Sequence, residues 1–158
     1  MNKLIYFYIG STLFILFVLQ DALQLRWEGL YQLQEDQFYR RWSGLGLLFI
    51  ILFQWTLSIV RSVEKWQAKS IAFYKVHNWL GALTPLLFYL HSMELGFAYL
   101  FILSITFFSN FLMGMFNFDV IKTTSKLFFQ GWMIVHVSLS LLITTLTFYH
   151  IWVVFYYE

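Results

Sequence analysis

Hydrophobic residues fill five long runs of this chain, and short polar segments separate the runs. A helix needs about 20 mostly apolar residues to cross a membrane, and each run reaches or approaches that length. The pattern therefore predicts a bundle of five transmembrane helices, at Leu4–Leu23, Ser43–Val63, Ile71–His91, Leu95–Phe116 and Gly131–Tyr156. Lys3 precedes the first run, as in a signal peptide, but no small-x-small cleavage site follows, so we interpret this run as a retained first helix.

The polar segments between the runs differ in length. "RWEGLYQLQEDQFYRRW" (residues 26–42) joins the first two runs, and its Trp and Tyr residues suit a short helix lying on the membrane surface. "HSMELG" (residues 91–96) is so short that the third and fourth helices must be antiparallel neighbours.

Composition agrees with a membrane protein. Hydrophobic residues make up 60% of the chain and charged residues 11%, whereas a soluble domain of this size needs far more polar surface. We predict one all-α integral membrane domain over residues 1–158, surrounded by membrane lipid. The absence of cysteine excludes disulfides, iron–sulfur ligation and a thiolate nucleophile. A net charge of +2 is too small to indicate a nucleic-acid partner.

Basic residues gather on one side of the predicted bundle. The side that holds the N-terminus carries Lys3, Arg61, Lys65, Lys69, Lys75, Lys122 and Lys126, and the other side carries Arg26, Arg40 and Arg41. Because cytoplasmic loops are enriched in Lys and Arg, we expect the N-terminus in the cytoplasm and the C-terminus outside. A bacterial inner membrane is the location that we expect.

All four histidines lie in the third and fifth runs, in two pairs of equal spacing. His77 and His91 are fourteen positions apart, as are His136 and His150. Fourteen residues of helix rise about 21 Å and return to almost the same face. Because the third and fifth helices should run parallel, His77 should lie level with His136, and His91 with His150.

Opposed neutral imidazoles without a carboxylate or thiolate suit the axial ligation of heme iron. The two levels are too far apart to share one metal ion, and a zinc site would need more ligands at each level. Imidazoles are also costly in lipid and indicate function there. The sequence therefore predicts two stacked heme sites between the third and fifth helices.

Other residues near the histidines are candidates for cofactor contacts. The small residues Gly81, Thr84 and Ser140 share faces with the histidines and would leave room for a flat macrocycle. Helix packing explains Gly81 and Ser140 better than cofactor contact does, and a kink at Pro85 would explain Thr84. Basic residues near the span ends would pair with heme propionates, although interfacial anchoring explains them as well. They are Arg40 and Arg41 for the outer site and Arg61 and Lys75 for the inner site.

These residues resemble the ferric reductase-like transmembrane domain superfamily. It includes the membrane parts of ferric reductases and NADPH oxidases and the heme subunit of the periplasmic methionine sulfoxide reductase system. "VHNWLG" with "YLH", and "GWMIVH" with "FYH", match its two ligand histidines on each of two helices, and the resemblance covers about residues 43–158. It implies that His77 and His136 bind an inner b heme and that His91 and His150 bind an outer one. It also implies electron transfer from the cytoplasmic side to the outside.

The oxidases and reductases of that superfamily continue into a module that binds FAD and NAD(P)H, whereas this sequence has no Gly-rich dinucleotide motif. We therefore expect an electron-transfer subunit without a complete active site and without an FAD or NAD(P) site. Its donor would be a flavoprotein or a membrane quinol, and its acceptor a protein or small molecule outside.

Two alternative functions are open. One is a quinol-oxidising cytochrome b subunit, for which the interval from His91 to His136 is short. The other is a membrane scaffold or small transporter with a histidine proton relay. No acidic residue lies well inside a predicted span to support such a relay.

Overall fold

A computed structural model describes residues 4–157, except for the side chains of Phe118 and Asp119, so Lys3 and Glu158 lie outside the described part. Helices and their connections account for all of these residues, which confirms the predicted all-α fold for them. The helices are α1 (Ile5–Ala22), α2 (Glu28–Glu35), α3 (Gln37–Gln54), α4 (Thr56–Ser62), η1 (Glu64–Lys69), α5 (Ser70–His91), α6 (Tyr99–Met115), α7 (Phe118–Ile121) and α8 (Lys126–Tyr157).

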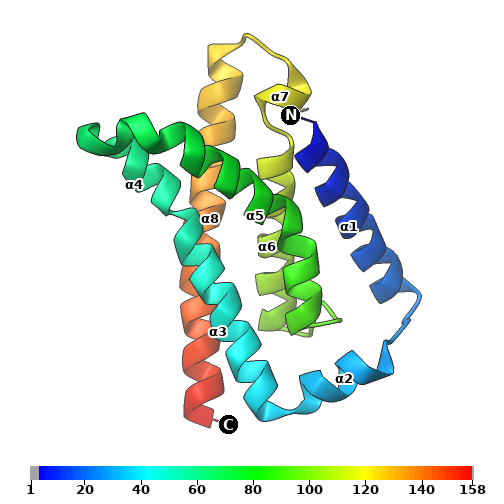
Figure 1. Cartoon of the computed structure of the whole chain (residues 1–158). Coiled ribbons are helices and arrows are strands. Elements are labelled where there is room, and N and C mark those ends of the chain that lie inside the picture. The colour runs from blue at the N-terminus through cyan, green and yellow to red at the C-terminus, as the bar shows by residue number, and fades with distance from the viewer. Residues whose placement is uncertain (1–3, 158) are drawn as a thin grey trace.

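The bundle has two distinct ends (Figure 1). The start of α1, α7 and the start of α8 lie at one end, which we call the N-terminal end. The end of α8, α2 and the connection between α5 and α6 lie at the other, the C-terminal end. Helices α5 and α8 both run from the N-terminal to the C-terminal end, so they are parallel, as the sequence predicts.

Three helical segments are long and apolar enough, by length and composition, to cross a membrane. They are Ile5–Ala22, Gln37–Ser62 and Lys126–Tyr157, and they correspond to the first, second and fifth predicted spans. Helix α6 is apolar but has only 17 residues, and α5 is not among the three. Three of the five predicted spans therefore coincide with helices that could cross a membrane.

The second span starts earlier than predicted and is interrupted. Helix α3 begins at Gln37 rather than Ser43 because the Asp36 carboxylate caps it, accepting a hydrogen bond from the Tyr39 N–H at 2.8 Å. At Trp55 the backbone turns, and the Trp55 N–H bonds to the Leu52 carbonyl at 3.1 Å before α4 continues. The hydrophobic pattern does not reveal this interruption because apolar residues run through it.

Aromatic residues of α1, α5 and α6 form a buried core. Phe17, Phe88, Phe108 and Phe111 are each at most 7% exposed. The Phe108 ring lies 4.9 Å from Phe17 and 4.8 Å from Phe88, between centroids. Pairs at these distances add about 0.5–1.5 kcal/mol beyond simple burial, so Phe108 links all three helices.

Helices α5 and α8 do not pack closely against each other. Helix α5 packs against α1, α3, α4 and α6, whereas α8 packs against α6 and α3. Helices α3 and α6 therefore hold α5 and α8 apart on either side.

Replacement of Phe108 by alanine should destabilise the bundle, because it opens a cavity where three helices meet. We expect the free energy of unfolding to fall by about 3 kcal/mol. Phe101→Ala on the same helix is the control, because Phe101 is 47% exposed, and it should change stability by less than about 0.5 kcal/mol. The measurement is unfolding by SDS in detergent micelles, followed by circular dichroism; equal losses in both variants would contradict the assigned core.

Candidate metal centres

The four histidines form two facing pairs across α5 and α8. The ring centroids of His77 and His136, the inner pair, are 6.3 Å apart. Those of His91 and His150, the outer pair, are 6.5 Å apart. The structure thus brings together the residues that the spacing pairs, one pair toward each end of the bundle.

The separation within each pair matches the space that one metal ion needs. Imidazole nitrogens bind metal ions at about 2 Å and lie roughly 1 Å from the ring centroid, so rings on opposite sides of one ion have centroids about 6 Å apart. The ring planes of the two pairs are inclined by 78° and 73°. Either ring can rotate about its own nitrogen–metal bond without changing the distance to the ion. The angle between the two ring planes is therefore not restricted by binding. Each pair therefore has room for one metal ion between its two imidazole rings.

Hydroxyl groups orient the rings of the outer pair. The Ser43 hydroxyl on α3 lies 3.0 Å from His91 Nδ1, and the Tyr99 hydroxyl on α6 lies 3.4 Å from His150 Nδ1. Histidines that bind metals nearly always hold their other ring nitrogen in such a bond. A hydroxyl beside Nδ1 of each ring favours Nε2 as the nitrogen that would bind a metal ion.

The inner pair is held by different contacts. Both Nδ1 atoms of this pair are buried without a hydrogen-bond partner. The Trp132 indole stacks on His136 with a centroid separation of 5.4 Å and an angle of 12°, and its N–H donates to the Met113 carbonyl at 2.7 Å.

Two glycines allow neighbouring helices to approach the histidine rings. A Cβ atom on Gly44 of α3 would lie 3.0 Å from His91 Cε1. One on Gly114 of α6 would lie 3.3 Å from His136 Cε1. Each pair therefore has one ring that rests directly on the backbone of a flanking helix, where a larger residue would displace it.

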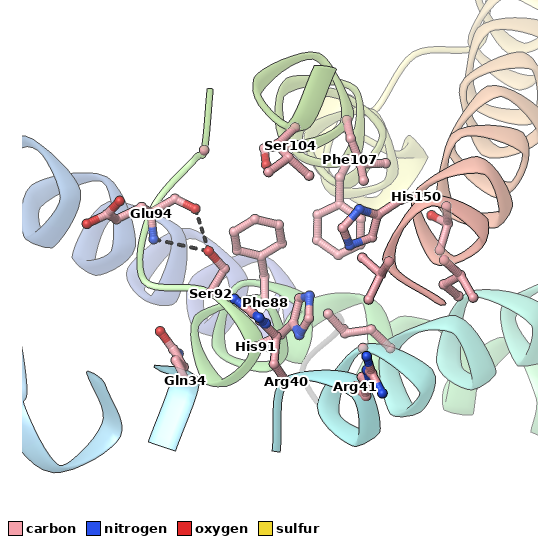
Figure 2. Close-up of a pocket in the computed structure, with 18 of the residues that line it drawn as sticks. Gln34, Arg40, Arg41, Phe88, His91, Ser92, Glu94, Ser104, Phe107 and His150 are labelled. Atoms are coloured by element: carbon pink, nitrogen blue, oxygen red, sulfur yellow. Dashed lines mark hydrogen bonds between the residues drawn. The ribbon is translucent and has the colours of Figure 1, made fainter. Parts of the chain in front are cut away.

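A cavity of about 360 Å³ surrounds the outer pair, and we call it the outer cavity. In Figure 2, His91 and His150 point into it from α5 and α8, and Phe107 of α6 forms another wall. Its volume lies within the range of small-molecule sites, and it extends past the histidines toward both α3 and α6. A flat ligand held between the two rings has space on both sides.

Both arginines predicted for the outer site line the outer cavity. The Arg41 guanidinium lies 5.3 Å from the centroid of Phe155, and its Nε is buried without a hydrogen-bond partner. A buried part of a cationic group that lacks an acceptor favours an anionic ligand group beside it.

The remaining predicted contacts are Gly81, Thr84 and Ser140. The Thr84 hydroxyl donates to the Leu80 carbonyl within α5. Ser140 exchanges hydrogen bonds with Asn110 of α6 and thus joins α6 to α8. Gly81 faces the Gln54 amide, at 3.9 Å from its added Cβ. None of the three residues lines the outer cavity, and that any of them contacts a cofactor stays a prediction.

The two cations predicted for the inner site lie at exposed positions. The Arg61 guanidinium lies 5.7 Å from the centroid of the Tyr74 ring. Lys75 is two residues before His77 on α5. That either contacts a cofactor stays a prediction.

Sequence reasoning missed Ser43, Gly44, Tyr99 and Gly114. These residues lie on α3 and α6 rather than on the helices that carry the histidines. Their role depends on how four helices pack, and no spacing along the chain encodes it. Trp132, by contrast, is marked by its position one helical turn before His136.

No group of three or more His, Cys, Asp or Glu residues that could hold a bare metal ion occurs among the described residues. The facing pairs fit a metal whose other ligands come from a macrocycle. Comparisons with protein-family models, curated proteins and solved structures gave no match for the chain. The proposal for its function therefore depends on the geometry of the site.

Valine at position 44 should disturb the outer pair, because its side chain would collide with the His91 ring. We expect a loss of about 1–3 kcal/mol in the free energy of unfolding, as overpacking causes. Gly46→Val, two residues away on α3, is the matched control, because its added Cβ meets nothing within 4 Å. Unfolding by SDS in micelles measures both, and a Gly44→Val protein as stable as the control would contradict the close approach.

Proposed function

We propose that the protein carries electrons across a membrane through two b hemes, each held by one facing pair of histidines. The observation that carries this proposal is geometric. Two pairs of imidazoles face each other at 6.3 and 6.5 Å on helices that do not pack closely together. An arrangement for structure alone would bring α5 and α8 into contact, because close packing drives helix association in membranes.

A heme at each level would supply one-electron redox chemistry. The protein's own residues fix its position. His77 and His136 would hold the heme iron at the inner level, and His91 and His150 would hold it at the outer level. Arg40 and Arg41 line the outer cavity and would neutralise propionates there, while Gly44 gives the His91 ring its place.

The proposed topology has five crossings, with α5 and α6 added to the three most apolar segments. Helix α5 carries Lys75, His77, Asn78 and His91, which lower its hydropathy. Metal ligation would give two of these polar groups a role within the membrane. Helix α6 spans about 25 Å with its 17 residues, slightly less than a hydrocarbon layer of about 30 Å.

The proposed orientation places the N-terminal end in the cytoplasm. The segment α4–η1 and the first turns of α5 carry Arg61, Lys65, Lys69 and Lys75, which supports a cytoplasmic position. A flavoprotein or a membrane quinol would supply electrons there, and an outside protein or small molecule would accept them. The resemblance to the ferric reductase-like transmembrane domain supports this direction of transfer.

Substitution of single histidines should remove hemes in pairs. We expect the native protein to approach two hemes per chain by pyridine hemochrome assay. His77→Ala and His136→Ala should each lose the same heme, because they remove opposite ligands of one iron. His91→Ala and His150→Ala should each lose the other, as seen in low-spin ferric EPR signals.

Gly131→Ala is the control, because Gly131 has open space around it near the start of α8, and it should keep both signals. A native protein that folds but contains no heme would overturn the proposed function. Matching spectra for His77→Ala and His150→Ala would instead overturn the pairing.

Labelling of single cysteines should establish whether α5 and α6 cross the membrane. The chain has no cysteine of its own, so one introduced thiol reports one position. Lys65→Cys and Thr124→Cys should react with an impermeant maleimide only from the cytoplasmic side, and Phe97→Cys only from outside. Leu141→Cys, on the exposed apolar face of α8, should react from neither side. Reaction of Lys65→Cys and Phe97→Cys from the same side would show that α5 does not cross.

A further inference from the structure

The side chain of Gln34 on the surface helix α2 is bonded to the end of α5. Its Nε2 donates hydrogen bonds to the Tyr89 carbonyl at 2.8 Å and to the Leu90 carbonyl at 3.2 Å. Its Oε1 accepts one from the Met93 N–H at 3.1 Å. One amide thus binds the chain on both sides of His91.

These contacts satisfy groups that α5 cannot satisfy itself. The last carbonyls of a helix have no partner within the helix, and α5 ends at His91. The Tyr39 hydroxyl adds a second bond to the Leu90 carbonyl, at 2.8 Å. Met93, which follows this turn, is only 2% exposed. The end of α5 is therefore closed by groups from α2 and α3.

The final turn of α5 needs such an external contact. Pro85 lies between His77 and His91 within the helix, and a proline removes one backbone hydrogen bond of the helix and clashes with the preceding turn. The position of His91 is thus less firmly coupled to the first half of α5. An ion pair between Arg26, just before α2, and Glu94, just after α5, also links the two regions at 2.6 Å. Its side chains are 42% and 51% exposed, and exposed ion pairs contribute little to stability.

We propose that Gln34, which also lines the outer cavity, is a positioning residue for the outer metal centre and acts through the turn that carries His91. It fixes the turn that carries His91, so that the ring meets Ser43 and faces His150. None of the described hydrogen bonds of Gln34 reaches the inner pair. We therefore expect Gln34 to affect the outer pair and not the inner one. This inference rests on the proposed function for its effect on heme, whereas the closure of α5 stands on the contacts themselves.

Two variants of Gln34 distinguish the loss of the hydrogen bonds that close α5 from a general loss of folding. Gln34→Leu keeps the size of the side chain but removes all three bonds. Gln34→Glu keeps an acceptor for the Met93 N–H but sets a carboxylate against the Tyr89 and Leu90 carbonyls. Gln32→Leu is the control on the same helix, because Gln32 makes only an exposed 3.4 Å bond to Glu28.

The first measurement, hydrogen exchange, does not depend on heme. The Met93 amide should exchange about tenfold faster in Gln34→Leu than in the native protein, because it loses its acceptor. It should stay protected in Gln34→Glu and in Gln32→Leu. Unchanged exchange in Gln34→Leu would overturn the closure of α5.

The second measurement concerns the hemes. In both Gln34 variants we expect a shift in the EPR g-values and midpoint potential of the heme whose signal is lost in His91→Ala. The other heme should keep its values. An unchanged outer heme, or equal shifts of both hemes, would overturn the positioning role. A native protein without heme would overturn the proposed function, and the exchange of Met93 would still decide the closure.

Discussion

The separation of α5 from α8 is the constraint on which the rest of the structure depends. Helices in an apolar solvent associate by close packing, yet these two face each other through histidine rings instead of through packed backbones. Helices α3 and α6 keep the space open by packing against both. The aromatic core around Phe108 then lies on α1, α5 and α6, so the packing that stabilises α5 is distinct from its contact with the histidines of α8. Helix α5 is thus stabilised by packing against α1 and α6, whereas the space between its histidines and α8 stays open.

The inner and outer pairs share a separation but differ in surroundings. Hydroxyls approach both rings of the outer pair, and two arginines line its cavity. At the inner pair, both Nδ1 atoms are buried without partners, and an indole ring stacks on His136. Hydrogen bonds to a ligating histidine and nearby charge both alter the electronic properties of a bound metal. Two histidine pairs with nearly the same separation therefore have different electrostatic environments.

Much of this arrangement follows from the sequence, because it is periodic. The apolar runs predict the long helices, and the equal histidine spacing predicts which rings meet. The sequence does not predict the turn at Trp55, because an apolar run continues through it, or the early start of α3, because Asp36 caps a polar segment. It also gives no sign of Ser43, Gly44, Tyr99 or Gly114, which reach the histidines from separate helices. Contacts between elements depend on rotation and distance, and hydrophobic periodicity specifies only which face of a helix is apolar.

Ser43 and Gly44 are consecutive residues of α3, and both meet His91: one supplies a hydroxyl and the other leaves room for the ring. Asp36 alone separates α3 from α2, whose Gln34 holds the same turn of α5. One inserted residue in this extended connection would shift α3 relative to α2, and these contacts would no longer coincide. The length of the connection between α2 and α3 is therefore restricted by these contacts with the end of α5.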